Sequence, residues 1–232
     1  MKLLLAIAAL LTGCSAAPNL PDGIPAGFSL QEEHDFETAA SLSAWAFSDP
    51  QAWRWNLAGV LELTGASEYA PPYRSPRSIA LLDTAAYGDF VLEAELVQTG
   101  RDYGHRDLCL FFGFGGPARY YYVHLATTPD ERAHNVFVVN QEARRALLPV
   151  LERGVEWGRD ERHRVRLERI GDRIRVFFDD FERPIMSVED STHGPGRIGF
   201  GSFDDQGLFD NVRIWAARSM PLEGVPFASA GS

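Results

Sequence analysis

Several features are scarce or missing in this 232-residue chain. Helix signals are few, and only residues 38–47 and 129–132 favour a short helical turn. The formal net charge is -10 and no basic patch is present, which argues against nucleic acid as a partner. No Gly-x-Ser-x-Gly elbow, metal-binding His/Cys cluster or phosphate loop occurs, so three familiar kinds of catalytic site are not expected.

Cysteine is rare, and the two present are Cys14 and Cys109. Lys2 and a short apolar run precede Cys14, which is the pattern of a secretory signal peptide. The run is shorter than the about 20 residues that a membrane-spanning helix needs. Leu11-Thr12-Gly13-Cys14 resembles the bacterial lipobox, and this resemblance implies cleavage before Cys14 and acylation of its thiol. The alternative is an ordinary signal peptide cut after Ala16 or Ala17.

Lipidation of Cys14 would leave Cys109 without a disulfide partner. Cys109 lies in the apolar run 108–112, so we expect a buried small hydrophobe there rather than a nucleophile. Ser15 would follow the lipidated cysteine, and by resemblance to bacterial lipoprotein sorting this favours attachment to the outer membrane.

The chain divides by composition into four parts. Residues 1–13 are expected to be the signal peptide, and residues 14–27 the lipidated cysteine and a stiff tether. Residues 28–218 have the length of one ordinary domain. Residues 219–232 are rich in small residues and proline without periodicity, so we expect a flexible tail.

Apolar and polar residues alternate along most of the domain, or form short apolar runs bounded by turn residues. Many short strands in this arrangement predict an all-β, two-sheet antiparallel sandwich. The expected strands are 33–37, 53–57, 60–64, 78–82, 89–99, 107–114, 119–126, 135–141, 163–170, 173–179, 185–189, 197–203 and 209–216.

Two stretches predict which side chains face the core. Gly171-Asp172 separates two alternating strands, and Gly171 suits the positive φ of a type II′ hairpin turn. Core-facing residues there are Val165, Leu167, Ile174, Val176 and Phe178, while Arg164, Arg166, Arg173 and Arg175 are expected to face water. In a second strand, Phe90, Leu92, Ala94 and Leu96 share one face, and Glu93 and Glu95 lie on the other.

The last third of the chain carries a family resemblance. Gly-Arg-Ile-Gly-Phe-Gly-Ser-Phe-Asp-Asp at 196–205 and Gly-Leu-Phe-Asp-Asn-Val-Arg-Ile-Trp at 207–215, with the strands at 173–179 and 77–82, resemble the concanavalin A-like jelly rolls. The pattern is most similar to the 3-keto-disaccharide hydrolase domain family and to laminin G-like domains. The resemblance implies a jelly-roll sandwich with ligands on the concave face of one sheet or on its rim.

The glycines of this ending also have a physical meaning. Gly199 and Gly201 alternate along the strand and so permit close approach by another backbone or a ring. The side chains of Asp210 and Asn211 are expected to accept hydrogen bonds from backbone N–H groups at a turn.

Tyr120, Tyr122 and His124 occupy alternate positions, so they share one face of a strand. The opposite face, which carries Tyr121, Val123 and Leu125, is more apolar and is expected to face the core. Ring-bearing residues on a sheet face suit stacking on a sugar. The alternative is plain cross-strand packing.

His105-Arg106-Asp107 precedes an apolar strand and suits acid–base work on a hydroxylated substrate. The alternative is a solvated turn with a local ion pair. His124, His105 and Asp107 are therefore the candidate catalytic residues.

Further candidates for binding sugar hydroxyls are Arg77, Asn135 and Asn140, each next to an apolar strand. The amides also suit turn capping.

Other carboxylates suggest two further kinds of site. Asp35, Asp204, Asp205 and Asp210 carry the hard oxygen donors that a structural calcium ion prefers, although their spacing is not that of a calcium loop. Glu93 and Glu95, two residues apart on one strand face, would serve a retaining glycosidase only if the two carboxyl groups flanked the scissile bond.

Together these patterns predict an exported, lipid-anchored domain that binds or processes carbohydrate. The hydrolase resemblance implies cleavage of keto-glycosides through proton abstraction beside the keto carbon. The alternatives are a non-catalytic glycan- or protein-binding module on the cell surface and a structural lipoprotein.

Overall fold

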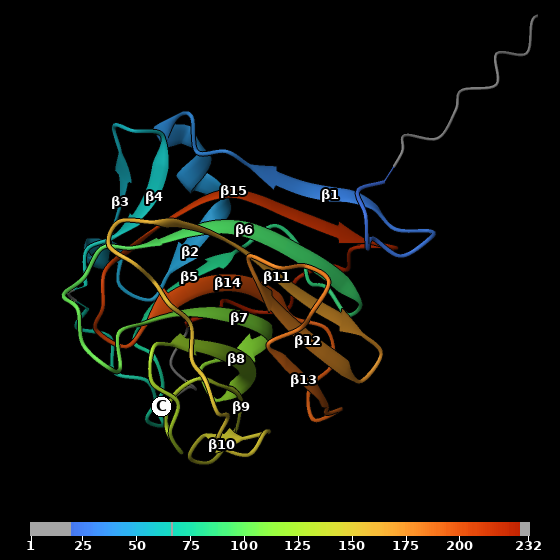
Figure 1. Cartoon of the computed structure of the whole chain (residues 1–232). Coiled ribbons are helices and arrows are strands. Elements are labelled where there is room, and N and C mark those ends of the chain that lie inside the picture. Colours follow the sequence, from blue (N-terminus) through green and yellow to red (C-terminus); the bar gives the residue numbers. More distant parts are fainter. Residues whose placement is uncertain (1–19, 66, 228–232) are drawn as a thin grey trace, which may run out of the picture.

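The computed structural model describes residues 20–65 and 67–227 (Figure 1). Two antiparallel sheets lie face to face, with β15, β6 and β11 in one layer and β14, β7 and β8 in the other. The expected two-sheet antiparallel sandwich is confirmed. Within the described residues, no helix has the length and apolar character needed to cross a membrane. The lipobox-like residues 11–14, including Cys14, lie outside these residues.

The first sheet has eight strands, with β1 paired to β15 beside the main path. Its strands in spatial order are β13 (Met186–Glu189), β12 (Arg173–Phe178), β11 (Arg162–Ile170), β6 (Phe90–Gln98), β15 (Gly207–Ala216), β4 (Val60–Leu63) and β3 (Trp53–Asn56), with β1 at Ser29–His34.

The second sheet has seven strands and carries the candidate site. Its strands in spatial order are β10 (Arg145–Ala146), β9 (Asn135–Asn140), β8 (Arg119–Ala126), β7 (Asp107–Gly116), β14 (Arg197–Ser202), β5 (Ser78–Leu82) and β2 (Trp45–Phe47).

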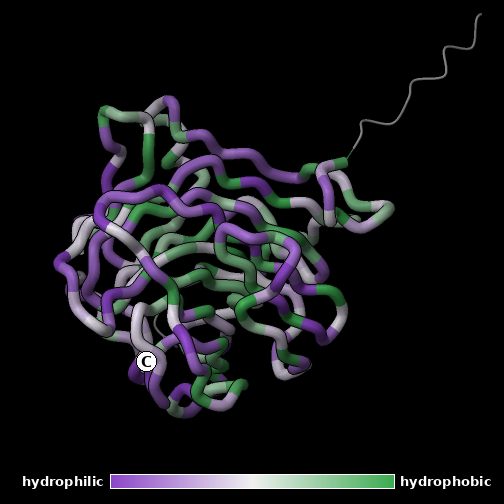
Figure 2. Tube along the Cα trace, in the orientation of Figure 1, coloured by the Kyte–Doolittle hydropathy of each residue, from purple (hydrophilic) through white to green (hydrophobic). Residues whose placement is uncertain are grey.

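The main core lies between the two sheets. It contains Phe90, Leu92, Ala94 and Leu96 from β6, as their alternation predicts. Figure 2 shows the hydrophobic residues concentrated along the central strands. Burial of this apolar surface is the main force that holds the sheets together.

A second apolar cluster covers the outer face of the seven-stranded sheet. Its buried members are Ile79, Leu81, Cys109, Phe111, Phe114, Tyr120, Tyr122, Phe137 and Val139. Half-buried aromatic residues from loops, including Tyr69, Tyr73 and Phe203, pack over them. Both faces of this sheet are therefore buried over much of their area.

The two expected helical turns are only partly correct. Residues 38–47 contain a 3₁₀ helix, Ala39–Ala44, followed by strand β2. Trp45 of β2 is buried against Phe200, so packing of this ring determines the strand. Residues 129–132 form a turn closed by the bridge between Asp130 and Ala133 rather than a helix. The short strand β10 was not expected.

The β11–β12 hairpin has Gly171 at a φ of 60°, which confirms the predicted positive φ. One residue of the hairpin departs from expectation, because Arg166 is buried rather than facing water. It pairs with Glu93, donates to the backbone oxygen of Asp22 and lies over the Phe181 ring. The expected tether therefore folds back, in its described part, over this side of the sheet.

The C-terminal segment also differs from the expected flexible tail. Met220 pairs with Ala86 in a β-bridge, and Arg197 donates to the backbone oxygen of Gly224 at 2.7 Å. Phe227 packs edge-on against Phe114, with 5.8 Å between ring centroids. These contacts hold the described part of the segment, up to residue 227, against the domain.

The glycine-rich strand β14 approaches β5 closely, as predicted. An added Cβ at Gly199 would lie 2.0 Å from the oxygen of Ala80. At the other predicted feature, Asn211 has a φ of 49° at a register shift in β15, and Asp210 accepts from its backbone N–H. Asp210 and Asn211 therefore shape the strand.

Candidate functional site

A polar cleft of about 920 Å³ opens above the outer face of the seven-stranded sheet, where β7 begins and β8 ends. Its walls come from loops that are distant in sequence, at 67–77, 101–105, 130–133 and 203–204, together with Arg144. Of the predicted residues, His124, His105, Asp107 and Arg77 line it. The structure thus brings together four residues that the sequence indicated separately.

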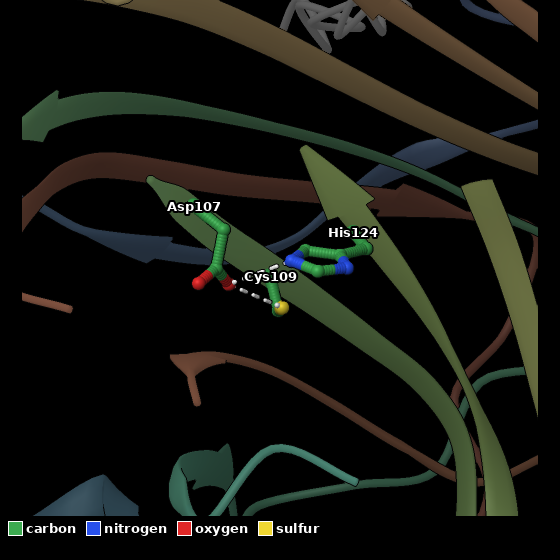
Figure 3. Close-up of side chains that lie close together, drawn as sticks. All are labelled: Asp107, Cys109 and His124. Atoms are coloured by element: carbon green, nitrogen blue, oxygen red, sulfur yellow. Dashed lines mark hydrogen bonds and ion pairs between the residues drawn. The ribbon is translucent and has the colours of Figure 1, made fainter. Parts of the chain in front are cut away.

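Three buried side chains from β7 and β8 meet at the floor of the cleft (Figure 3). Cys109 is paired with His124 across the two strands, and Asp107 lies two residues before Cys109 on the same face. The Cys109 thiol donates to Asp107 Oδ2 at 3.1 Å, and His124 Nε2 lies 3.3 Å from the same oxygen. The sequence indicated Asp107 and His124 separately and did not indicate Cys109, because the cross-strand register brings the three together.

A second layer of hydrogen bonds fixes Asp107. Ser202 Oγ donates to Asp107 Oδ1 at 3.0 Å. The backbone N–H of Asp107 donates to Asp205 Oδ2 at 2.9 Å, and the Tyr103 hydroxyl donates to that same oxygen at 2.7 Å. These contacts leave Asp107 Oδ2 directed toward Cys109 and His124.

The two ring nitrogens of His124 have different surroundings. Nδ1 lies 3.2 Å from the backbone oxygen of Arg132, which can only accept, so Nδ1 carries the proton. Nε2 is buried and its approach to Asp107 is an ion-pair contact without hydrogen-bond geometry, which leaves Nε2 with no hydrogen-bond partner. A carboxylate facing this nitrogen requires a proton or a cation between them.

The electrostatics of the cluster argue against a nucleophilic cysteine. Burial raises the pKa of the Cys109 thiol well above its ordinary value, and the neighbouring Asp107 charge raises it further. Burial alone would raise the pKa of the Asp107 carboxyl, but its interactions with His124 and nearby hydrogen-bond donors hold that pKa below its ordinary value. The unliganded thiol is therefore protonated, and a thiolate attack is not available.

His105 lies at the rim of the cleft and is exposed. Its Nε2 is 2.8 Å from Asp130 Oδ2, an ion pair between two partly exposed side chains. Such a pair contributes little to stability but places a donor and an acceptor beside the opening.

Arg144 also lines the cleft, although no pattern in the sequence indicates it. Its Nη1 donates to the Tyr122 hydroxyl at 2.7 Å, and its Nη2 donates to the backbone oxygen of Arg132 at 2.9 Å. The guanidinium also lies 4.9 Å from the Phe137 ring centroid and 4.7 Å from that of Phe203. Arg144 lies in a loop, where no periodicity indicates which way a side chain points.

Tyr120 and Tyr122 lie on the face opposite the core, as their parity predicts, but both are buried. Loops cover this face, and each hydroxyl is used internally: Tyr120 donates to Ser75 Oγ at 2.6 Å. Contrary to expectation, the two rings present no open stacking surface. The half-buried rings of Tyr69, Tyr103 and Phe203 line the cleft instead.

The two predicted asparagines also lie elsewhere. Asn135 is buried, and its amide bonds the backbone of Leu148 in both directions, at 2.9 and 3.0 Å. Asn140 is exposed at the other end of β9, opposite Arg119. Asn135 therefore stabilises the loop before β11, and Asn140 does not contribute to the cleft.

The remaining carboxylates do not form the sites considered above. Glu93 pairs with Arg166, and Glu95 pairs with Arg162, both in the eight-stranded sheet. Asp210 also pairs with Arg162, so the four aspartates considered for calcium do not converge. Among the described residues, the group with metal-ligand spacing is Asp107, Cys109 and His124, whose donor atoms lie within 4.8 Å of one another.

Comparison with known proteins establishes the fold. No family model matches the chain. A levanase of Bacillus sp. (strain L7) is 25% identical over 185 residues, which cover 79% of this chain and 19% of that enzyme. The chain thus spans less than a fifth of the length of this relative.

Two solved structures show the same architecture. The carbohydrate-binding module CBM66 from Bacillus subtilis superposes with a TM-score of 0.57 at 18% identity, covering 75% of this chain and 96% of that one. SCLam, a non-specific endo-β-1,3(4)-glucanase of family GH16, superposes with a TM-score of 0.54 at 13% identity, covering 86% and 95%. The domain is therefore a concanavalin A-like jelly-roll sandwich.

Proposed function

We propose that this protein binds carbohydrate in the cleft above the β7–β8 floor, as a non-catalytic module. The observation that carries the proposal is the cleft itself, an open, polar hollow of about 920 Å³ on one sheet of a jelly roll. Exposed guanidinium groups of Arg74 and Arg77 and the exposed carboxylate of Asp204 line it. Charged donors and acceptors beside half-buried aromatic rings suit a sugar's hydroxyl rim and its C–H face.

The arrangement supports binding more than catalysis. His124 uses Nδ1 within the fold, and its Nε2 is buried and faces Asp107, so neither nitrogen is presented to a ligand in the cleft. His105 is paired with Asp130. Proton abstraction from a keto-glycoside by His124, His105 or Asp107 is the competing activity, and it would require these contacts to break.

The relatives suggest which glycans to test first. The levanase is named for levan, a fructan, and its similarity covers most of this chain. The carbohydrate-binding module has nearly the same extent as the matched part of this chain. We therefore propose fructan as the first ligand class, with β-1,3(4)-glucan as the second.

Calorimetric titration with levan and β-1,3(4)-glucan tests this proposal. Arg77→Ala removes an exposed charged donor from the cleft and is expected to weaken binding about tenfold, since hydrogen bonds to charged groups are worth about 1.5–3 kcal/mol. Arg54→Ala is the matched control, because Arg54 is also exposed, lies on β3 and pairs with Glu62 outside the cleft.

Equal losses in the two variants, or no binding of either polysaccharide, would refute the cleft as a glycan site. Incubation with ordinary and 3-keto disaccharides completes the test. If the protein consumes a substrate and a His124→Ala variant does not, the protein is an enzyme and not a non-catalytic binding module.

We also propose that the protein is exported and anchored through an acylated Cys14, with the outer membrane as its location. The lipobox-like residues 11–14 support this proposal. An anchored domain would hold its cleft close to the cell envelope, where polysaccharides are encountered.

A further inference from the structure

We propose that Asp107, Cys109 and His124 form a zinc-binding site at the floor of the cleft. This inference stands on the geometry of the three side chains and does not depend on carbohydrate binding. The residues come from two paired strands, which makes their spacing a fixed property of the sheet. All three are buried, so the donors are not a chance grouping of surface charges.

Two of the three donor–donor distances are close to those of a tetrahedral ion, and the third lies within 4.8 Å. Zinc–nitrogen and zinc–oxygen bonds of about 2.0–2.2 Å and zinc–sulfur bonds of about 2.3 Å place neighbouring donors roughly 3.3–3.6 Å apart. Here His124 Nε2 lies 3.3 Å and Cys109 Sγ lies 3.1 Å from Asp107 Oδ2. A slight outward shift of the thiol accommodates the ion.

The outer contacts of the ligands are those that a metal site needs. His124 Nδ1 faces the Arg132 carbonyl, which directs the Nε2 lone pair into the cluster. Nε2 itself is buried without a hydrogen-bond partner. Ser202 donates to Asp107 Oδ1, so Oδ2 remains the ligating oxygen.

Charge balance favours a divalent ion here. Zinc binding releases one proton from the Cys109 thiol to solvent, and the thiolate and the Asp107 carboxylate together neutralise the ion. The zinc-bound cluster is therefore neutral, whereas the metal-free cluster carries the single negative charge of Asp107. It also removes the conflict between a bare Nε2 lone pair and a carboxylate oxygen.

The mixed donor set selects the type of metal. A thiolate with an imidazole and one carboxylate suits zinc, whereas calcium and magnesium prefer all-oxygen sites. Asp107 and His124 line the cleft, which provides a path for entry. Three protein ligands leave a fourth position for a water molecule from the cleft, the pattern of an open zinc site.

Metal titration of the full chain carrying Cys14→Ser tests the site, because Cys109 is then its sole thiol. Titration with Zn²⁺ should give one ion per chain. Titration with Co²⁺ should give an intense thiolate-to-cobalt charge-transfer band. Adding Cys109→Ser should abolish the band and weaken Zn²⁺ binding at least tenfold, while His105→Ala should change neither.

A cobalt spectrum without the charge-transfer band, or Zn²⁺ affinity unchanged by Cys109→Ser, overturns the proposal. Zinc-edge X-ray absorption of the Cys14→Ser protein decides the matter even if the double variant fails to fold. A single sulfur neighbour at about 2.3 Å supports the site. A shell of nitrogen and oxygen only would place the ion at surface groups such as His105 and Asp130 and would refute it.

Discussion

At the scale of the residue, buried histidines tie the stability of this domain to pH. His134 is buried, and its Nδ1 accepts a hydrogen bond from the Ala126 N–H at 3.3 Å, which requires the neutral ring. Burial lowers its pKa to about 4, with a further contribution from the nearby His124. The unfolded chain titrates near 6.5, so the folded state binds fewer protons between these two values.

We therefore expect a loss of stability on acidification from His134. Its contribution is complete above about pH 6.5 and falls as the pH drops toward 4, by about 2 kcal/mol at pH 4.5. His134→Asn should flatten this part of the profile, and asparagine tolerates the local φ of 51°. Urea unfolding at pH 7 and pH 4.5 measures the effect. If both proteins lose the same stability, the assignment to His134 is wrong.

At the scale of the element, close contact between β14 and β5 depends on glycine. An added Cβ at Gly201 would lie 2.1 Å from the Ser78 oxygen and 2.9 Å from the Phe111 ring. The backbone oxygen cannot move without separating the two strands. Both sides of this sheet are packed, so the separation would disturb two apolar clusters.

Gly201→Ala should therefore destabilise the domain by about 3 kcal/mol, the upper part of the range for overpacked cores. Gly194→Ala is the matched control, because no atom lies within 4 Å of its added Cβ. Thermal unfolding of both variants checks the prediction. Similar melting temperatures for the two would show that β14 shifts more easily than its contacts indicate.

At the scale of the whole molecule, the proposed anchor would determine where the domain resides. Each acyl methylene buried in the membrane contributes about 0.8 kcal/mol, so an acylated Cys14 should hold the protein on membranes. Fractionation of cells that express the intact chain should recover it with membranes and recover Cys14→Ser in the soluble fraction. Mass spectrometry showing a mature chain that begins at Ala17 or Pro18 would contradict this.

The sequence by itself determined most strands of the sandwich, though not β2 or β10, and which face of these strands most side chains occupy. A hairpin is specified by the alternation in 163–170 and 173–179 and by the glycine between them. Alternation identifies the core-facing side chains because successive side chains of a strand point to opposite faces of the sheet. The same period places Tyr120, Tyr122 and His124 away from the core. These are local properties, which the sequence encodes directly.

The tertiary structure alone decided what covers each face and which residues meet. Loops over the seven-stranded sheet bury Tyr122, and the N-terminal segment buries Arg166, although their parity indicated exposure. Cys109 joins His124 because β7 pairs with β8 in one particular register. Coverage and register depend on contacts between segments far apart in the chain, and side-chain periodicity within one strand contains no information about them.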